Sequence, residues 1–166
     1  MQELLEKKTA PKKESDKNKL LRVCFVCTGN TCRSPMAEAV ANALAKETGT
    51  QIEAFSAGLY ASEGEPISKN ALLALEEAKI PEVHPYHLHL SHTITETEAA
   101  GYDRLIGITE RHAMELFFRF PGLLKKITAL PHDVADPYGG DLAAYRACLE
   151  QLQKEVAELL FPEVAK

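Results

Sequence analysis

The octet at residues 27–34 constrains this chain more than any other segment. It reads Cys-Thr-Gly-Asn-Thr-Cys-Arg-Ser, follows the apolar run 21–26 and precedes Pro35. The run is typical of a buried parallel strand, and a proline fits the first turn of a helix, where its missing N–H costs nothing. The octet is therefore predicted to be a tight loop that leads from a strand into a helix. Such a loop directs backbone N–H groups toward one spot beside a positive helix N-terminus, an arrangement that binds anions.

Strand-like and helix-like patterns alternate along the rest of the chain. The predicted strands cover 21–27, 51–57, 103–109 and 126–130. The predicted helices cover 35–47, 68–79, 94–101 and 110–120, and a long last helix follows a capping Asp141. This alternation predicts an α/β fold, a single-domain four-stranded parallel sheet with helices on both faces and right-handed crossovers. Ligands of such sheets bind at the carboxyl ends of the strands, where the octet lies.

The composition argues against several classes of protein. The chain has 166 residues, 45% of them hydrophobic, which suffices for one domain with its own core. A net charge of −5 argues against a nucleic-acid partner, because binding a phosphate backbone requires a concentrated positive face. No apolar stretch reaches the roughly 18 residues that span a membrane, and no apolar signal core opens the chain. Four clustered cysteines fit a reducing compartment, so we expect a cytoplasmic protein.

The first 19 residues differ in composition from the remainder. They hold six lysines and four acidic residues, with Leu4 and Leu5 as the large apolar side chains. Such a segment buries too little apolar surface to offset its conformational entropy. We therefore predict a charged, disordered extension at 1–19 and a folded domain at 20–166.

The residue types of the octet match cysteine-dependent phosphoryl transfer. Cys27 is the candidate nucleophile, because a helix N-terminus and a nearby arginine favour the thiolate form. Arg33 presents a fixed, two-pronged cation to two phosphoryl oxygens. The remaining residues supply backbone donors, positive-φ conformers and hydroxyl groups, and Ser34 is also a candidate helix cap: Thr28, Gly29, Asn30, Thr31, Cys32 and Ser34. Because the loop and Arg33 neutralise the phosphoryl charge, this chemistry needs no cofactor and no metal.

A proton donor for the leaving group is expected on a loop after the last strand. Asp136, in the sequence Asp-Pro-Tyr-Gly-Gly, reaches the same edge of the sheet as the octet. It is predicted to act as an acid for the leaving group and then as a base for the incoming water. Asp133 is the alternative acid, and it has a competing structural use in the loop.

Three segments resemble the low-molecular-weight protein phosphatases: 26–38, Ser56-Ala57-Gly58 and 136–140. The resemblance covers nearly all of the chain from Leu20 onward. It implies strand order 2-1-3-4, a cysteinyl-phosphate intermediate, phosphorylated proteins as substrates, inorganic phosphate as product, and a monomer or weak dimer. It also implies Cys27 as nucleophile, Arg33 as phosphate clamp and Asp136 as general acid, with Asn30 and Ser34 bracing the loop.

Thr31 bears on the choice of substrate within that family. The protein-arginine phosphatase branch resembles this chain in carrying threonine at this position, where the tyrosine-phosphatase branch usually carries an aliphatic residue. A hydroxyl suits a planar, polar phosphoguanidinium, whereas a bulkier aliphatic side chain suits the face of a phenyl ring. Tyr138 and Tyr60 are the candidate mouth residues, since a guanidinium stacks on either ring. We therefore expect phosphoarginine as substrate, with phosphotyrosine as the alternative.

Cysteines and histidines outside these roles suggest further possibilities. Cys32 lies in the same loop as Cys27, and a reversible disulfide between them is predicted to protect Cys27 from over-oxidation. Cys24 and Cys148 are predicted to be buried and inert. A metal site is not predicted for the histidine-rich stretch, because its spacing is irregular and an exposed polar loop explains it: His84, His87, His89 and His92.

Two other functions compete with a phosphatase. Arsenate reduction requires a further pair of closely spaced cysteines downstream, and this chain has Cys148 alone after Cys32. A non-catalytic phospho-residue-binding module would use the same loop, but such a module has no use for a general acid at position 136.

Overall fold

The structure, a computed structural model, describes residues 19–165, so the predicted 1–19 extension lies almost wholly outside the described residues. Its centre is a four-stranded sheet in the order β2-β1-β3-β4, in which every neighbouring pair is parallel. The strands are β1 (Leu21–Cys27), β2 (Ile52–Gly58), β3 (Arg104–Gly107) and β4 (Ile127–Ala129). The predicted parallel sheet and its order 2-1-3-4 are therefore confirmed.

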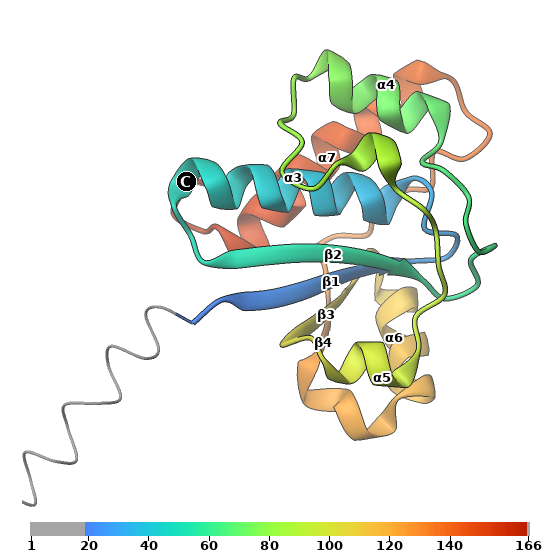
Figure 1. Cartoon of the computed structure of the whole chain (residues 1–166), viewed down its shortest axis with the longest axis vertical. Helices are drawn as coiled ribbons and strands as arrows, with labels where there is room; N and C mark the ends of the chain where they lie inside the picture. Colours follow the sequence, from blue (N-terminus) through green and yellow to red (C-terminus); the bar gives the residue numbers. More distant parts are fainter. Residues whose placement is uncertain (1–18, 166) are drawn as a thin grey trace, which may run out of the picture.

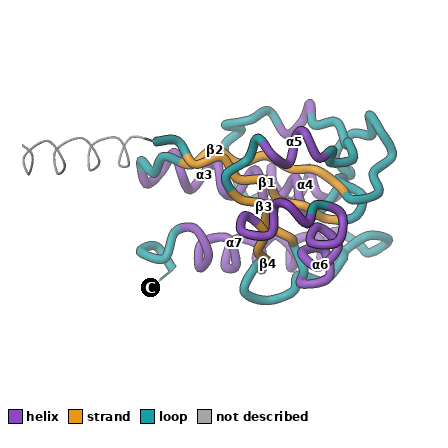
Figure 2. Tube along the Cα trace, turned by 90° about the horizontal axis from the view of Figure 1, so that it is seen from below, coloured by secondary structure: helices purple, strands orange, loops and turns teal. Residues whose placement is uncertain are grey.

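Helices cover both faces of this sheet (Figure 1). One face carries α3 (Arg33–Thr48), α4 (Lys69–Glu77) and α7 (Leu142–Leu160). The opposite face carries α5 (Glu96–Ala100) and α6 (Glu110–Arg119). Figure 2 shows the strands running through the middle of the molecule with helices around them. Each face of the sheet has its own hydrophobic cluster beneath the helices, so both faces are buried, as expected of a parallel sheet.

Strand β1 is buried on both faces, as its continuous apolar sequence predicts. Val23 and Phe25 point into the cluster beneath α3 and α7, while Cys24 and Val26 point into the cluster beneath α5 and α6. Successive side chains alternate between faces, so only a strand covered on both sides tolerates such a run. Central placement of β1 puts Cys27, its last residue, at the middle of the carboxyl edge of the sheet.

The last two strands, β3 and β4, are shorter than predicted because residues at their predicted ends belong to neighbouring helical segments. Thr109 caps α6 and leaves the sheet, although the Ile108 N–H still donates to the Val26 carbonyl at 3.0 Å. A 3₁₀ segment, η2 (Pro121–Lys126), replaces the predicted start of β4 and was not predicted as a helix. A second one, η1 (Tyr86–Leu88), lies inside the histidine-rich stretch.

The end of β2 lies directly beside the 28–32 loop because Gly58 has no side chain. A Cβ atom at Gly58 would come within 2.7 Å of the Thr28 carbonyl oxygen and 3.1 Å of the Asn30 Cβ. The Tyr60 N–H donates to that same Thr28 carbonyl at 3.0 Å. The Ser56-Ala57-Gly58 segment therefore forms one wall against which the loop is built.

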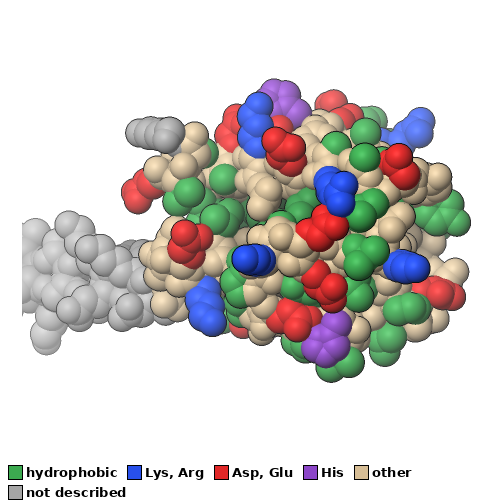
Figure 3. Space-filling model, turned by 90° about the horizontal axis from the view of Figure 1, so that it is seen from above, with side chains coloured by type: hydrophobic (Ala, Val, Ile, Leu, Met, Phe, Trp, Pro, Cys, Tyr) green, Lys and Arg blue, Asp and Glu red, His purple; other side chains and the backbone are tan. Residues whose placement is uncertain are grey.

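On the face seen in Figure 3, acidic, basic and apolar side chains are interspersed. Within residues 19–165, no helix is both long enough and apolar enough to span a membrane.

Candidate active site

The Cys27 sulfur lies at the base of the loop, between the Asn30 N–H and the Ser34 hydroxyl. The Asn30 N–H donates to Sγ at 3.3 Å, and the Ser34 Oγ lies 2.9 Å from it. Helix α3 begins at Arg33, two residues earlier than predicted, so Ser34 does not cap it. The N-cap position is Cys32, with no side-chain capping bond, and the Ser34 hydroxyl is turned toward the sulfur instead. The predicted contact between Ser34 and the thiol is therefore present, whereas its predicted capping role is wrong.

Asn30 holds the loop in shape from a left-handed conformation, with φ of 58°. Its side-chain nitrogen Nδ2 donates to the Ser34 Oγ at 2.9 Å and to the Ser56 Oγ at 3.1 Å. Its side-chain oxygen Oδ1 accepts from the His92 N–H at 3.1 Å, and its backbone carbonyl oxygen lies 2.7 Å from the His89 Nε2. Because the buried amide is bonded from both ends, the loop's conformation is fixed before any ligand arrives.

Arg33 and Asp136 face each other across the loop. The buried Arg33 guanidinium donates through Nη1 to the Val134 carbonyl at 3.1 Å, and its Nη2 lies 3.6 Å from the Asp136 Oδ2. The other Asp136 oxygen accepts from the Tyr138 N–H at 3.0 Å. The Asp136 side chain is 53% exposed against 9% for Arg33, so the carboxylate has room to turn toward a ligand.

Asp133, the alternative acid, has a structural position. Its Oδ1 accepts from the Glu110 N–H at 2.8 Å, at the first residue of α6, and its carbonyl accepts from the Gln151 amide at 2.9 Å. These contacts join the loop to α6 and α7. Asp133 does not line the pocket above Cys27, which leaves Asp136 as the carboxylate at that pocket.

The pocket above the sulfur has a volume of about 230 Å³. Its lining comes from the loop and from the segment after β4: Cys27, Thr28, Gly29, Asn30, Thr31, Cys32, Arg33, Asp136 and Tyr138. Ser34 lies fully buried beneath it. Every predicted site residue except Tyr60 is thus brought to one place.

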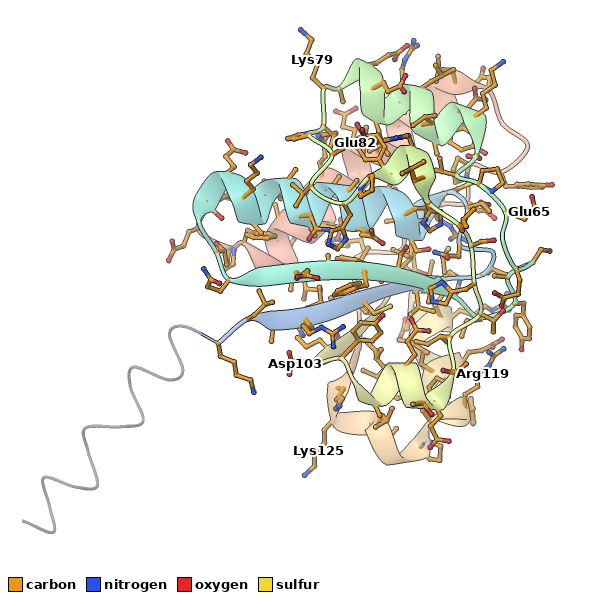
Figure 4. The ribbon with its side chains drawn as sticks, in the orientation of Figure 1. Glu65, Lys79, Glu82, Asp103, Arg119 and Lys125 are labelled. Atoms are coloured by element: carbon orange, nitrogen blue, oxygen red, sulfur yellow. The ribbon has the colours of Figure 1, made fainter. Side chains whose placement is uncertain are left out.

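Tyr60 lies apart from the pocket lining, contrary to the prediction that it stands at the mouth. The Arg119 guanidinium lies 4.4 Å from the centre of its ring. Arg119 comes from the end of α6 (Figure 4). Arg119 also donates to the Leu59 carbonyl at 2.7 Å, so the ring is held toward α6. Tyr138, in contrast, lines the pocket and is 79% exposed.

The four cysteines are all buried and unpaired. The Cys32 Sγ lies 3.3 Å from the Ser68 Oγ and 3.4 Å from the Tyr145 hydroxyl. Burial raises the pKa of Cys24, and it raises the pKa of Cys148 to about 12, as expected for inert core thiols. The reversible Cys27–Cys32 disulfide stays a prediction.

Most of the histidine-rich stretch is exposed loop, as its sequence suggested, but His84, His89 and His92 are half-buried and have defined partners. His84 lies 3.3 Å from a Glu38 oxygen, and His92 lies 2.8 Å from a Glu98 oxygen. These carboxylates raise the pKa of both imidazoles by hydrogen bonding to their protonated forms. His87 pairs with Glu82 and is the exposed member of the stretch. Each histidine thus has its own partner, and His89 and His92 also brace Asn30.

His112 is a site residue that the sequence analysis missed. It is buried in the first turn of α6, where its Nε2 lies 3.0 Å from the Thr28 Oγ1. Its Nδ1 accepts from the Thr109 N–H at 3.2 Å, and Thr109 accepts in return from the His112 N–H, which completes a capping box. The spacing of Thr109 and His112, three residues apart, could have predicted the capping box, but it does not indicate the contact with Thr28.

Burial, followed by the nearby Arg33 charge, lowers the pKa of His112 to about 4. In the unfolded chain this imidazole takes up a proton near pH 6.5. Between these values the unfolded state binds more protons than the folded state, so stability falls as pH is lowered from 6.5 to 4. We expect His112→Asn, which keeps an acceptor for the Thr109 N–H, to lose less stability over this pH range than the wild type. Thermal unfolding of the variant and the wild type at matched pH values measures the difference, and the same dependence of stability on pH in both proteins would contradict the prediction.

The comparisons with known proteins agree with this geometry. A family model described as low molecular weight phosphotyrosine protein phosphatase matches residues 22–166. A protein-arginine-phosphatase from Bacillus subtilis (strain 168) is 32% identical over 144 residues, which cover 82% of this chain and 93% of that protein.

Solved structures give the same picture. A low molecular weight protein tyrosine phosphatase from T. tengcongensis superposes with a TM-score of 0.78 at 37% identity, covering 84% of this chain and 97% of that one. The YwlE arginine phosphatase, in a mutant form with a phosphorylated active-site serine, gives 0.77 at 32% identity, covering 84% and 93%. Over residues 22–166, the chain belongs to the low molecular weight phosphotyrosine protein phosphatase family.

Proposed function

We propose that this chain is a cysteine-dependent protein phosphatase that hydrolyses phosphoarginine through a cysteinyl-phosphate intermediate. The observation that carries the proposal is the juxtaposition in one pocket of the Cys27 sulfur, the Arg33 guanidinium and the Asp136 carboxyl. A nucleophile, a clamp and a proton donor are the three groups that phosphoryl transfer to sulfur requires.

The first step transfers the phosphoryl group to the enzyme. The Cys27 thiolate attacks phosphorus in line with the leaving guanidine nitrogen, so the S–P bond forms as the P–N bond breaks. Asp136, in its protonated form, gives its proton to that nitrogen, so the arginine side chain leaves as its guanidinium cation and Asp136 is left as a carboxylate. Arg33 and the loop N–H groups hold the three phosphoryl oxygens throughout.

The second step frees the enzyme. The Asp136 carboxylate accepts a proton from a water molecule, whose oxygen attacks phosphorus as the S–P bond breaks. The products are inorganic phosphate and the Cys27 thiolate, and Asp136 is again protonated. The exposed position of Asp136, beside the pocket and bonded through one oxygen to the Tyr138 N–H, suits a group that serves both steps.

Two pocket residues support phosphoarginine over phosphotyrosine. Thr31 lines the pocket with its hydroxyl 3.7 Å from the Cys32 sulfur, a weak partner that leaves the hydroxyl free to bind a guanidinium N–H. The exposed ring of Tyr138 lies at the mouth, where a guanidinium stacks. The arginine-phosphatase relatives are consistent with this choice. A low molecular weight tyrosine phosphatase is the second candidate, supported by the 37% identity to such an enzyme from T. tengcongensis.

Replacing Thr31 tests the choice of substrate. We expect Thr31→Ile to lower kcat/KM for a phosphoarginine peptide by about tenfold and to raise it for the matched phosphotyrosine peptide, because one hydrogen bond is lost and apolar surface is gained. Thr31→Ser, which keeps the hydroxyl, is the control and should retain the original preference. An unchanged ratio of the two substrates in Thr31→Ile would contradict Thr31 as the selector.

A further inference from the structure

Thr28, the second residue of the loop, has a hydroxyl that the mechanism above does not use. Thr28 lines the pocket. Within the part of the chain that the structure describes, its hydroxyl has a single hydrogen-bond partner, the Nε2 of His112 at 3.0 Å. His112 comes from α6, on the opposite face of the sheet from α3, so the contact joins the loop to a separate layer of the fold.

The neighbours of His112 determine which atom is the donor in this contact. A backbone N–H can only donate, and the Thr109 N–H points at the His112 Nδ1 at 3.2 Å. The Thr109 Oγ1 lies 2.9 Å from the same nitrogen and accepts from the His112 N–H, so its own proton can also donate to Nδ1. Nδ1 is therefore the unprotonated nitrogen, and the single proton of the neutral ring is on Nε2. Burial of the ring also disfavours the doubly protonated form. The His112 Nε2–H thus donates to the Thr28 oxygen, and the Thr28 hydroxyl proton has to find another acceptor.

We propose that Thr28 is a further substrate-contacting residue of this site, and that His112 is the positioning residue that directs the Thr28 hydroxyl proton toward the phosphoryl group. The imidazole occupies one lone pair of the Thr28 oxygen, so the hydroxyl proton can turn to another acceptor, and Thr28 lines the pocket above Cys27. A phosphoryl oxygen is the acceptor expected there, because Arg33 and the loop N–H groups already place the anion above Cys27. The inference rests on the proposed function for its substrate, but phosphate binding tests it separately.

A neutral imidazole is suited to this task. It donates to the hydroxyl without adding a second positive charge beside Arg33, whose proximity already disfavours protonation of His112. A hydrogen bond from a neutral donor to a charged phosphoryl oxygen is strong enough to change binding by about tenfold when it is removed.

The experiment measures the dissociation constant of inorganic phosphate by calorimetry, and kcat and KM on an aryl phosphate, for a set of variants. Thr28→Val removes the hydroxyl at nearly constant shape, and Thr28→Ser keeps it. His112→Asn keeps the acceptor for the Thr109 N–H but does not reach Thr28. His112→Gln keeps a donor near the position of Nε2.

We expect Thr28→Val to weaken phosphate binding and to lower kcat/KM by about tenfold, and Thr28→Ser to stay within about twofold of the wild type. His112→Asn should weaken binding similarly, His112→Gln should recover part of the loss, and the double variant Thr28→Val/His112→Asn should be no weaker than Thr28→Val alone. This coupling distinguishes positioning from a general structural effect, which would make the two losses additive.

Two results would overturn the inference: phosphate binding by Thr28→Val that equals the wild type, or fully additive losses in the double variant. If the wild type binds phosphate but turns over no phosphorylated substrate, the proposed function fails. A weakened phosphate affinity of Thr28→Val would, in that case, still support Thr28 as a ligand-contacting residue.

Discussion

Replacing Cys27 by serine is expected to lower kcat by about 10³-fold or more while inorganic phosphate still binds. A serine hydroxyl stays protonated at neutral pH, and the donors around this position, the Asn30 N–H and the Ser34 hydroxyl, are not bases that could remove its proton. The Asn30 bonds to Ser56 and His92 do not involve the sulfur, so the loop keeps its shape in the variant.

Cys148→Ser is the matched control for this variant. Cys148 is also a buried thiol, but it lies on α7 and does not line the pocket, so its replacement should leave kcat near that of the wild type. Steady-state hydrolysis of an aryl phosphate and phosphate binding by calorimetry make both comparisons. Retention of more than a tenth of the activity by Cys27→Ser would show that another group attacks phosphorus.

Replacing Asp136 by asparagine is expected to lower kcat by about 10²- to 10⁴-fold and to leave phosphate affinity nearly unchanged. The asparagine oxygen can still accept from the Tyr138 N–H, so the loop holds its conformation while the titratable proton is lost. The defect should be largest for leaving groups that need protonation, such as the guanidine nitrogen, and smaller for an activated aryl phosphate. A binding module, by contrast, would lose nothing that it uses.

Asp133→Asn separates this role from the structural role of the same loop. Asp133 caps the start of α6 through the Glu110 N–H, so an effect on the free energy of unfolding of about 1 kcal/mol is expected, with little change in kcat. Thermal unfolding and steady-state kinetics of both asparagine variants make the comparison. Loss of turnover in Asp133→Asn with retention in Asp136→Asn would reverse the assignment of the acid.

The sequence was most informative where its signals were local and mutually consistent. The apolar run of β1, buried on both faces, and the proline that follows the loop together predicted a buried parallel strand and the helix after it. Boundaries were less predictable where two elements compete for one residue. Thr109 is a residue type common in strands, but its hydroxyl caps α6. Because Thr109 caps the start of the helix, β3 ends at Gly107, earlier than predicted.

The same distinction holds for the candidate site. The loop residues are contiguous in sequence, so their convergence on one pocket could be predicted, and Asp136 followed from the topology of a parallel sheet. The supporting groups come from distant segments: Ser56 from β2, His89 and His92 from the histidine-rich stretch, and His112 from α6. No local pattern specifies such contacts, because they depend on how the elements pack. At Ser34 a local pattern was misleading, because serine is typical of helix caps but here its hydroxyl contacts the Cys27 sulfur instead.

The central claim, hydrolysis of phosphoarginine by Cys27, is tested most directly by phosphate release from a pair of peptides. The two peptides share one sequence and carry either phosphoarginine or phosphotyrosine, and Cys27→Ser provides the blank. We predict faster release from the phosphoarginine peptide by the wild type and none above background by the variant. Faster release from the phosphotyrosine peptide would contradict the arginine assignment, and release from neither, with phosphate still bound, would contradict catalysis itself.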